Sequence, residues 1–249
     1  MRGCRIDKHL VDIGLVESRE KAQRLVMAGK VRTGDHVYRK SSEIVKSSAI
    51  VTLDQDEKFV SRGGYKIEKA LDYFEISVGG LVAIDAGAST GGFTDCLLQK
   101  GVKKIYSVDV GKGQLAWKLR NDPRVIVKEK LNARNMTARQ LDPKFEPVDL
   151  IVVDCSFISL KVLIPNLVLF LKPGGIMIPL IKPQFEAGKA LVDKGKGVIR
   201  DPQIHDDVIL SLKKFTKSEL GLEWKQVTES PILGPSGNKE FLVYISKKD

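Results

Sequence analysis

The segment from Ile84 to Asp95 constrains the fold more than any other part of the chain. It reads Ile-Asp-Ala-Gly-Ala-Ser-Thr-Gly-Gly-Phe-Thr-Asp, and it lies between an apolar run ending at Ile84 and a helix-like run from Thr94 to Lys100. A strand, a glycine-rich turn and a helix in this order are typical of α/β folds that present backbone N–H groups to a nucleotide-like ligand. For this segment alone, an ordinary tight turn is the alternative.

The order of the acid and the glycines discriminates between nucleotide ligands. Asp85 precedes the glycines, which do not form the G-x-G-x-x-G fingerprint, and no Gly-Lys-Ser/Thr closes a phosphate-binding loop. The pattern suits S-adenosylmethionine, whose methionine ammonium needs a nearby carboxylate and which has no phosphate. We therefore expect contacts to this cofactor from Asp85, Gly87, Ser89, Thr90, Gly91, Gly92 and Phe93.

Length and composition exclude several classes of protein. The 249 residues, 43% of them hydrophobic, suffice for one large domain, or for one large and one small domain. No apolar run reaches the ~18 residues that span a bilayer, and the first residues lack the apolar stretch of a signal peptide. Cys4, Cys96 and Cys155 are far apart, which favours reduced thiols over a disulfide framework or zinc site. The sequence therefore predicts a cytoplasmic protein with no membrane partner and no metal.

The positive charge is concentrated near the N-terminus. The net formal charge is +10, and residues 1–53 carry 11 Lys/Arg against 6 Asp/Glu. Such a block favours a polyanionic partner, nucleic acid before membrane, although a soluble basic protein without such a partner would also show it. We expect phosphate contacts from Arg5, Lys8, Arg19, Lys21, Arg24, Lys30 and Arg32.

The pattern predicts two domains, residues 1–60 and 61–249. The first shows two amphipathic helices, the second of which is capped by Ser18 and ended by Gly29. Short strands are expected at 30–33, 36–39 and 50–53, followed by a polar linker over 54–64. These features indicate a small α+β module ahead of a larger domain.

Strands and helices alternate in the larger domain. After a helix at 65–74, strands are expected at 81–85, 104–109, 125–128, 149–154, 176–182, 224–228 and 241–247, and helices at 94–100, 113–119, 137–141, 157–171 and 203–218. Alternation of this kind predicts an α/β fold with a doubly wound, Rossmann-like sheet of mostly parallel strands. We expect the seventh strand to be antiparallel, because a hairpin-like Pro/Gly loop joins it to the sixth.

Four of the expected strands end in a charged residue. Ligands of such sheets bind at the carboxyl ends of the strands, and Asp85, Asp109, Asp154 and Lys182 stand there. Asp109 is expected to accept hydrogen bonds from ribose hydroxyls. Asn132, which follows the third strand, is expected to pair with an adenine edge. Asp154 is a candidate both for cofactor binding and for the reaction.

Motifs that the sequence lacks reduce the number of candidate methyl acceptors. The segment Asp154-Cys-Ser-Phe157 lacks the prolines that mark amino-nitrogen methylases, and Cys155 lacks the neighbouring proline of carbon-5 pyrimidine methylases. A small buried residue is the favoured interpretation of Cys155. Lys182 remains beside Asp154, and a lysine whose pKa is lowered by burial or a nearby cation can deprotonate a ribose 2′-hydroxyl. This interpretation requires no metal.

Several segments, in order along nearly the whole chain, resemble the TlyA/haemolysin-A family. They are Ser61–Lys66, Asp85–Thr94, Asp154–Ser159, Ile181–Glu186, Gly197–Pro202 and Gly237–Phe241. Arg5–Val11 and Ser18–Gly29 resemble the small RNA-binding fold of tyrosyl-tRNA synthetases and pseudouridine synthases. The resemblance implies a ribosomal-protein-type RNA-binding module joined to a methyltransferase domain similar to FtsJ (RrmJ).

The resemblance also implies an activity, namely S-adenosylmethionine-dependent 2′-O-methylation of ribosomal RNA, at cytidines. The Lys-Asp-Lys-Glu tetrad of FtsJ-like enzymes falls on Lys66, Asp154, Lys182 and Glu240. By analogy, Lys182 is the base or the group that orients the hydroxyl, and the other three hold and tune it. The expected partner is ribosomal RNA or a ribosomal subunit. A non-catalytic RNA-binding or ribosome-assembly factor and a membrane-active haemolysin are the alternatives.

Overall fold

The computed structural model describes residues 3–54, 57–234 and 236–248. The chain forms two compact units, Met1–Glu57 and Lys58–Asp249. The sequence analysis placed the domain boundary after residue 60, and the observed division falls after Glu57. Each unit has its own hydrophobic core, and each is described by itself.

The first unit is a small α+β module. Its elements are β1 (Gly3–Arg5), α1 (Ile6–Asp12), α2 (Arg19–Met27), β2 (Val31–Thr33), β3 (His36–Tyr38), β4 (Ile44–Lys46) and β5 (Thr52–Leu53). The hydroxyl of Ser18 caps α2 by accepting a hydrogen bond from the Lys21 N–H. β1 pairs with β4, and β2 pairs with β3 and β5, all antiparallel. The sequence analysis missed β1 and β4, because no turn signal marks them, whereas Gly34-Asp35 marks the equally short β2 and β3.

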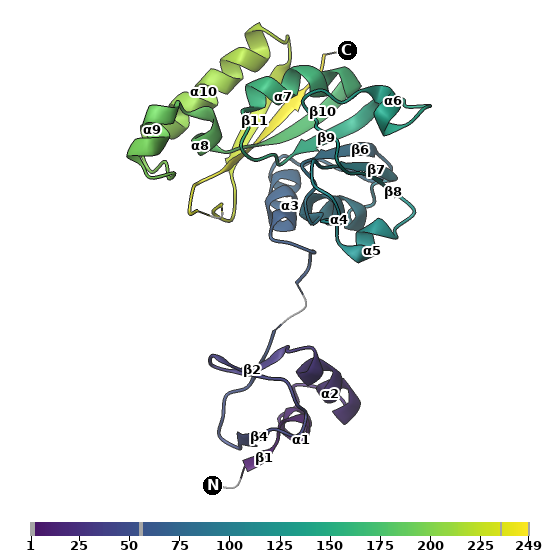
Figure 1. Ribbon diagram of the computed structural model, residues 1–249, viewed down its shortest axis with the longest axis vertical. Helices are drawn as coiled ribbons and strands as arrows, with labels where there is room; N and C mark the ends of the chain where they lie inside the picture. Colours follow the sequence, from purple (N-terminus) through teal and green to yellow (C-terminus); the bar gives the residue numbers. More distant parts are fainter. Residues whose placement is uncertain (1–2, 55–56, 235, 249) are drawn as a thin grey trace. The chain divides into compact units, whose positions relative to one another are not determined.

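A seven-stranded sheet organises the second unit (Figure 1), in the order β11-β12-β10-β9-β6-β7-β8. Its strands are β6 (Val82–Ala86), β7 (Lys104–Val108), β8 (Val125–Lys128), β9 (Val148–Val153), β10 (Leu171–Ile181), β11 (Glu223–Glu229) and β12 (Phe241–Ser246). β12 is antiparallel to both β10 and β11. The pairs β10–β9, β9–β6, β6–β7 and β7–β8 are parallel. The predicted doubly wound α/β sheet with an antiparallel last strand is therefore confirmed.

Helices cover both faces of this sheet, as Figure 1 shows. They are α3 (Gly63–Tyr73), α4 (Gly92–Gln99), α5 (Trp117–Arg120), α6 (Ala138–Leu141), α7 (Leu160–Leu167) with the 3-10 turn η1 (Val168–Phe170), α8 (Pro183–Glu186), α9 (Lys189–Lys194) and α10 (Pro202–Ser218). Ile67 of α3 and Leu97 of α4 belong to the core on one face, and Leu163 of α7 and Leu212 of α10 to the core on the other. The central strands are therefore buried on both faces, as parallel strands generally are.

Three expected helical boundaries were wrong. The helix expected at 157–171 begins only at Leu160, because Phe157 adopts a left-handed backbone with φ +63 that a helix does not accept. This helix ends at Leu167, where η1 follows it, and Leu171 already belongs to β10. The helix expected at 113–119 is reduced to α5, since Gly113 has φ +71. The short helices α8 and α9 were not predicted, because their few turns lie within a segment rich in glycine.

Candidate active site

The loop between β6 and α4 lies very close to the end of β9. Gly87 has φ +86, and a Cβ at this position would stand 2.6 Å from the carbonyl oxygen of Asp154. Gly91 has φ +98, and a Cβ there would collide with the side chain of Leu119. Only glycine tolerates such positions without strain. The glycines of the motif therefore bring the loop against β9 and α5.

Two cavities adjoin this loop at the carboxyl ends of the parallel strands. One has a volume of about 420 Å³, and its lining includes Arg62, Lys66, Lys182 and Leu233. The other has a volume of about 520 Å³, and its lining includes Asp109, Asn132 and Phe157. Both cavities are bordered by Gly87, Ser89, Asp154 and Ser156. A ligand in the larger cavity can therefore reach groups in the smaller one.

Four charged side chains from distant parts of the sequence meet at the smaller cavity. Lys66 Nζ of α3 donates a hydrogen bond of 2.7 Å to Glu240 Oε2, just before β12, and lies 3.7 Å from Asp154 Oδ2. Lys182 Nζ, at the end of β10, lies 2.6 Å from Asp154 Oδ1. The structure thus brings together the whole predicted tetrad, with Asp154 between the two lysines. Their role in the reaction stays a prediction.

Burial makes the alternation of charge in this cluster necessary. Lys66 and Lys182 are each 8% exposed, and Glu240 is 1% exposed. An isolated buried charge is expensive, whereas two ammonium groups and two carboxylates in alternation compensate one another. Glu240 Oε1 has no hydrogen-bond partner among the described residues. The cluster is therefore electrostatically balanced, and both lysines line the cavity.

Asp85 lies beneath the glycine-rich loop rather than in either cavity. It is fully buried, and its Oδ2 accepts hydrogen bonds from the Thr94 N–H at 3.0 Å and the Thr94 hydroxyl at 2.7 Å. Burial, with the nearby negative charge of Asp154, raises the pKa of Asp85 to about 7. Its Oδ1 has no partner among the described residues. The expected contact with a methionine ammonium therefore stays a prediction, and the observed contact of Asp85 is with the start of α4.

Asp85→Asn is expected to raise the melting temperature at about pH 8, with a gain that shrinks toward about pH 5. The folded protein keeps the Asp85 proton up to about pH 7, whereas the unfolded chain releases it near the ordinary value of 3.8. The free energy of unfolding therefore falls as the pH rises through this window. Asparagine is always neutral, and its amide oxygen still accepts from Thr94. Thermal unfolding across this pH range tests the prediction, and parallel curves for variant and wild type would contradict it.

The larger cavity contains the two side chains expected to contact a nucleoside. Asp109 accepts hydrogen bonds from the Ser89 N–H at 2.8 Å and the Gly111 N–H at 2.7 Å, one on each oxygen. Each carboxylate oxygen has a further lone pair, so the group can accept from a ligand in a fixed orientation. Asn132 Oδ1 accepts from the Arg134 N–H at 2.9 Å, which orients this exposed amide at the cavity wall.

The other predicted cofactor residues divide into two groups. Gly87, Ser89, Thr90, Gly92 and Phe93 line a cavity, whereas Gly91 shapes the loop without lining either one.

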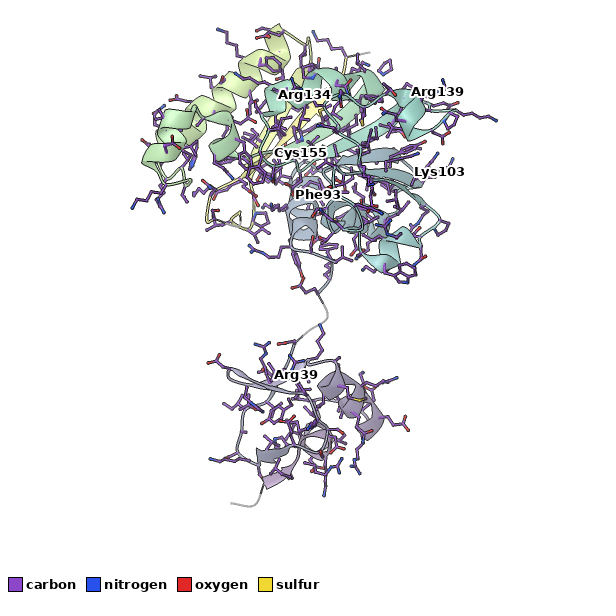
Figure 2. The ribbon with its side chains drawn as sticks, viewed as in Figure 1. Arg39, Phe93, Lys103, Arg134, Arg139 and Cys155 are labelled. Atoms are coloured by element: carbon purple, nitrogen blue, oxygen red, sulfur yellow. The ribbon has the colours of Figure 1, made fainter. Side chains whose placement is uncertain are left out.

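Figure 2 labels Phe93, at the start of α4, and Cys155, just after β9. The Cys155 thiol donates to the Ala86 carbonyl, and burial raises its pKa to about 12. A thiol with so high a pKa is a poor nucleophile at neutral pH, in keeping with the favoured interpretation of this residue.

The sequence analysis missed several residues of the two cavities. Phe157 borders the larger cavity, is 89% exposed, and has its ring centre 5.1 Å from that of Phe185. Arg62 and Leu233 border the smaller cavity, and the Arg62 guanidinium donates to the Leu233 carbonyl at 3.1 Å. The position of Phe157 directly after a charged strand end was an available signal. Arg62 lies within the Ser61–Lys66 segment that carries the family resemblance, but its place at the cavity was not predicted. Leu233 had no signal, because the two residues meet only through the tertiary fold.

The basic residues of the first unit differ in how they are held. Arg5 and Arg19 each lie 3.0 Å from the buried Asp7 carboxylate, and hydrogen bonds from Arg5, Gln23 and Arg19 hold the pKa of Asp7 well below its usual range. Lys21 forms an ion pair with Glu17, and Arg32 forms one with Asp54. Lys8 and Arg24 are exposed, and Lys30 is half-buried. All seven contribute to the surface of the unit, and their contact with RNA stays a prediction.

Two further properties concern residues 3–54, 57–234 and 236–248. No helix in this part of the chain is long and apolar enough to cross a membrane. In the same part, no three histidine, cysteine or acidic side chains are grouped as a metal site would require.

Comparison with known proteins gives matches over nearly the whole chain. The model of FtsJ-like methyltransferases matches residues 59–247, and that of the S4 domain matches residues 4–51. The 16S/23S rRNA (cytidine-2′-O)-methyltransferase TlyA of Mycobacterium tuberculosis is 44% identical over 246 residues, which are 98% of this chain and 90% of that protein. Hemolysin A of Brachyspira hyodysenteriae is 40% identical over 242 residues, 96% of this chain and 98% of that protein.

A solved structure from Streptococcus thermophilus, assigned as a hemolysin, shares the fold. It superposes with a TM-score of 0.75 and 41% identity, and the match covers 100% of this chain and 90% of that one. The sequence, the order of the domains and the fold of this chain therefore all match those of its relatives. The chain belongs to the TlyA/haemolysin-A family and joins an S4 domain to an FtsJ-like methyltransferase domain.

Proposed function

We propose that the chain is an S-adenosylmethionine-dependent methyltransferase that modifies the ribose 2′-hydroxyl of cytidines in ribosomal RNA. The observation that carries this proposal is the cluster of Lys66, Asp154, Lys182 and Glu240 beside a cavity that adjoins a nucleoside-sized one. The relatives named TlyA, which are rRNA (cytidine-2′-O)-methyltransferases, support the choice of acceptor.

The larger cavity suits the cofactor. Asp109 is positioned to accept from ribose hydroxyls, Asn132 to bond an adenine edge, and the loop from Gly87 to Phe93 to surround the methionine end. When bound, the cofactor supplies an electrophilic methyl group on a positively charged sulfur. The carboxylates of Asp109 and Asp154, whose negative charges help to raise the pKa of the buried Asp85, favour a cation at this place.

The four charged residues of the tetrad act on the methyl acceptor, the ribose 2′-hydroxyl. Lys182 lines the smaller cavity and either removes the proton of the 2′-hydroxyl or orients it. Asp154 holds the Lys182 amine, and Glu240 holds Lys66 on the other side of Asp154. Methyl transfer is a displacement at carbon that requires the oxygen in line with the carbon–sulfur bond. Alignment in such a site can lower the barrier by up to roughly 7–11 kcal/mol.

Phe157→Ala is expected to weaken RNA binding by about 1–3 kcal/mol. An exposed aromatic ring beside the reaction site is a platform on which an unstacked base can lie, and single-stranded or flipped nucleotides are commonly recognised in this way. Phe157→Tyr retains the ring and serves as the control. Fluorescence anisotropy with labelled RNA measures the effect, and unchanged RNA affinity in the alanine variant would contradict a stacking role.

The proposed activity has a direct test. The purified chain is incubated with radiolabelled S-adenosylmethionine and with small subunits, large subunits or naked ribosomal RNA, and the nucleosides are then identified by mass spectrometry. We expect 2′-O-methylcytidine in at least one substrate. A chain that binds RNA and cofactor but transfers no label to any of them would instead be the RNA-binding or assembly factor considered above.

Two further consequences follow from the proposal. We place the chain in the cytoplasm together with its rRNA substrate, and we expect the S4 domain to contact the RNA. A membrane-active haemolysin is the remaining alternative, raised by the name of the Brachyspira relative. Leakage of dye from liposomes on addition of the pure chain would favour that alternative, whereas intact liposomes together with RNA methylation support the enzyme.

A further inference from the structure

The two lysines of the tetrad differ in their partners. Lys66 Nζ lies 2.7 Å from Glu240 Oε2 and 3.7 Å from Asp154 Oδ2, so two carboxylates hold it. Lys182 Nζ lies 2.6 Å from Asp154 Oδ1 and donates a hydrogen bond of 2.8 Å to Ser156 Oγ. One carboxylate and one neutral hydroxyl therefore hold the lysine that faces the acceptor in the proposed function.

A neutral hydroxyl suits a lysine that changes its protonation state. An ammonium has three N–H donors, whereas a neutral amine has two N–H donors and one lone pair. With the Asp154 carboxylate 2.6 Å from the nitrogen and Ser156 accepting one N–H, both forms of Lys182 keep the same two contacts. Only the third position of the nitrogen changes, from a donor to a lone pair. A second carboxylate in place of the hydroxyl would favour the charged form more strongly.

The backbone fixes Ser156 relative to Lys182. The Asp154 N–H donates to the Ala86 carbonyl at 2.9 Å, which ties the start of the loop to β6. At the other end, the Ser159 hydroxyl and the Leu160 N–H donate to the Glu186 carboxylate at 2.6 and 2.7 Å. Glu186 belongs to α8, the helix that directly follows Lys182. The loop that carries Ser156 is therefore anchored to the segment that carries the lysine.

Ser156 is the second oxygen contact of a long and flexible side chain. Phe185 borders Lys182 elsewhere, with the ring centre 6.0 Å from Nζ, and an aromatic face attracts a cation without fixing the direction of its N–H groups. A lysine on a four-carbon stem that bonds Asp154 alone can rotate about that single contact. A second contact at a different angle removes this freedom. Ser156 lies where it is needed, because it lines both cavities.

We infer that Ser156 is a positioning residue for Lys182, and that its hydroxyl and Asp154 together aim the amine at the methyl acceptor. This inference rests on the proposed function, because the acceptor hydroxyl must enter the smaller cavity. Without the hydroxyl, Lys182 spends less time in the productive orientation. The loss then falls on the transfer step rather than on the binding of cofactor or RNA.

Ser156→Ala in the full-length chain tests this inference. Single-turnover methyl transfer with RNA and S-adenosylmethionine bound is expected to slow about tenfold to a hundredfold. The dissociation constants for both ligands, measured by calorimetry and anisotropy, are expected to stay within about twofold. Ser156→Thr keeps a hydroxyl on the same carbon and is expected to restore most of the rate. A merely structural role would lower the melting temperature or the affinities instead.

Ser211 provides a matched control. Its hydroxyl accepts a hydrogen bond of 2.8 Å from Lys161 Nζ, between α7 and α10 and outside both cavities. Ser211→Ala is expected to transfer methyl groups at the wild-type rate. If Ser156→Ala also does so, or if its whole loss appears in cofactor affinity, the inference is overturned while the methyltransferase stands. If the wild-type chain transfers no methyl group to any RNA, the proposed function fails and the inference fails with it.

Discussion

Lys182→Ala is expected to lower the rate of methyl transfer by about 10²–10⁴-fold, the usual contribution of a positioned acid or base. Its amine lies 2.6 Å from Asp154 and lines the cavity proposed for the acceptor, so its loss removes the group that deprotonates or orients the 2′-hydroxyl. Cofactor affinity is expected to change by less than about threefold, because Asp109, Asn132 and the glycine-rich loop are untouched. Single-turnover transfer and calorimetry measure the two quantities separately.

Lys161→Ala is the matched control for this experiment. Lys161 is an exposed lysine whose amine also donates to a serine hydroxyl, that of Ser211, and it lies outside the two cavities. Its replacement is expected to leave the rate unchanged. Transfer by Lys182→Ala at the wild-type rate would show that the tetrad does not act on the acceptor. Loss of cofactor binding in parallel with activity would instead assign Lys182 to the cofactor.

Removal of residues 1–53 is expected to weaken RNA binding by about 10²–10³-fold at low salt and to flatten its salt dependence. Each phosphate contact contributes about 0.9 to the slope of log K against log salt concentration, so the loss of all seven predicted contacts would reduce it by up to about 6. The remaining chain keeps Phe59, a core residue of the second unit. Binding measured over a range of salt concentrations gives both quantities.

The ion pairs of the first unit decide which point variants are informative. Replacement of Arg5 or Arg19 would leave the buried Asp7 carboxylate poorly compensated and would confuse stability with binding. Lys8 and Arg24 are exposed, so Lys8→Gln with Arg24→Gln changes the charge without breaking these pairs. This double variant is expected to reduce the salt slope by about 2. If neither the truncation nor the double variant changes the RNA affinity or the salt slope, the S4 domain does not contact the RNA.

Regular elements were predictable wherever their pattern was long enough. Five-residue strands such as β6 and β7, and the seventeen-residue α10 with its Asp201 cap and Pro202, have a clear periodicity. The three-residue strands β1 and β4 have none, and they lack the Gly34-Asp35 turn that revealed the equally short β2 and β3. The start of α7 was misplaced, because the left-handed backbone of Phe157 depends on the anchoring of its loop to Glu186 rather than on local preference.

The candidate site was predictable to the extent that it is local in sequence. The order of Asp85 and the glycines, and the charged residues at strand ends, identified the edge of the sheet that carries the two cavities. Glu240 was reached through the family resemblance, since 174 residues separate it from its partner Lys66. The burial of Asp85 beneath the loop left no trace in spacing or composition, whereas the position of Phe157 after Asp154 was a signal that the sequence analysis did not use.

The amino-acid sequence by itself determined the order of elements, the glycine-rich turn and the two-domain division, because backbone preference and apolar periodicity act between near neighbours in the chain. Only the tertiary structure decided which charges meet, which acid is buried beneath the loop, and which hydroxyl reaches Lys182. Such pairings join residues from separate elements. Their energies depend on burial and distance, which exist only once the sheet has assembled.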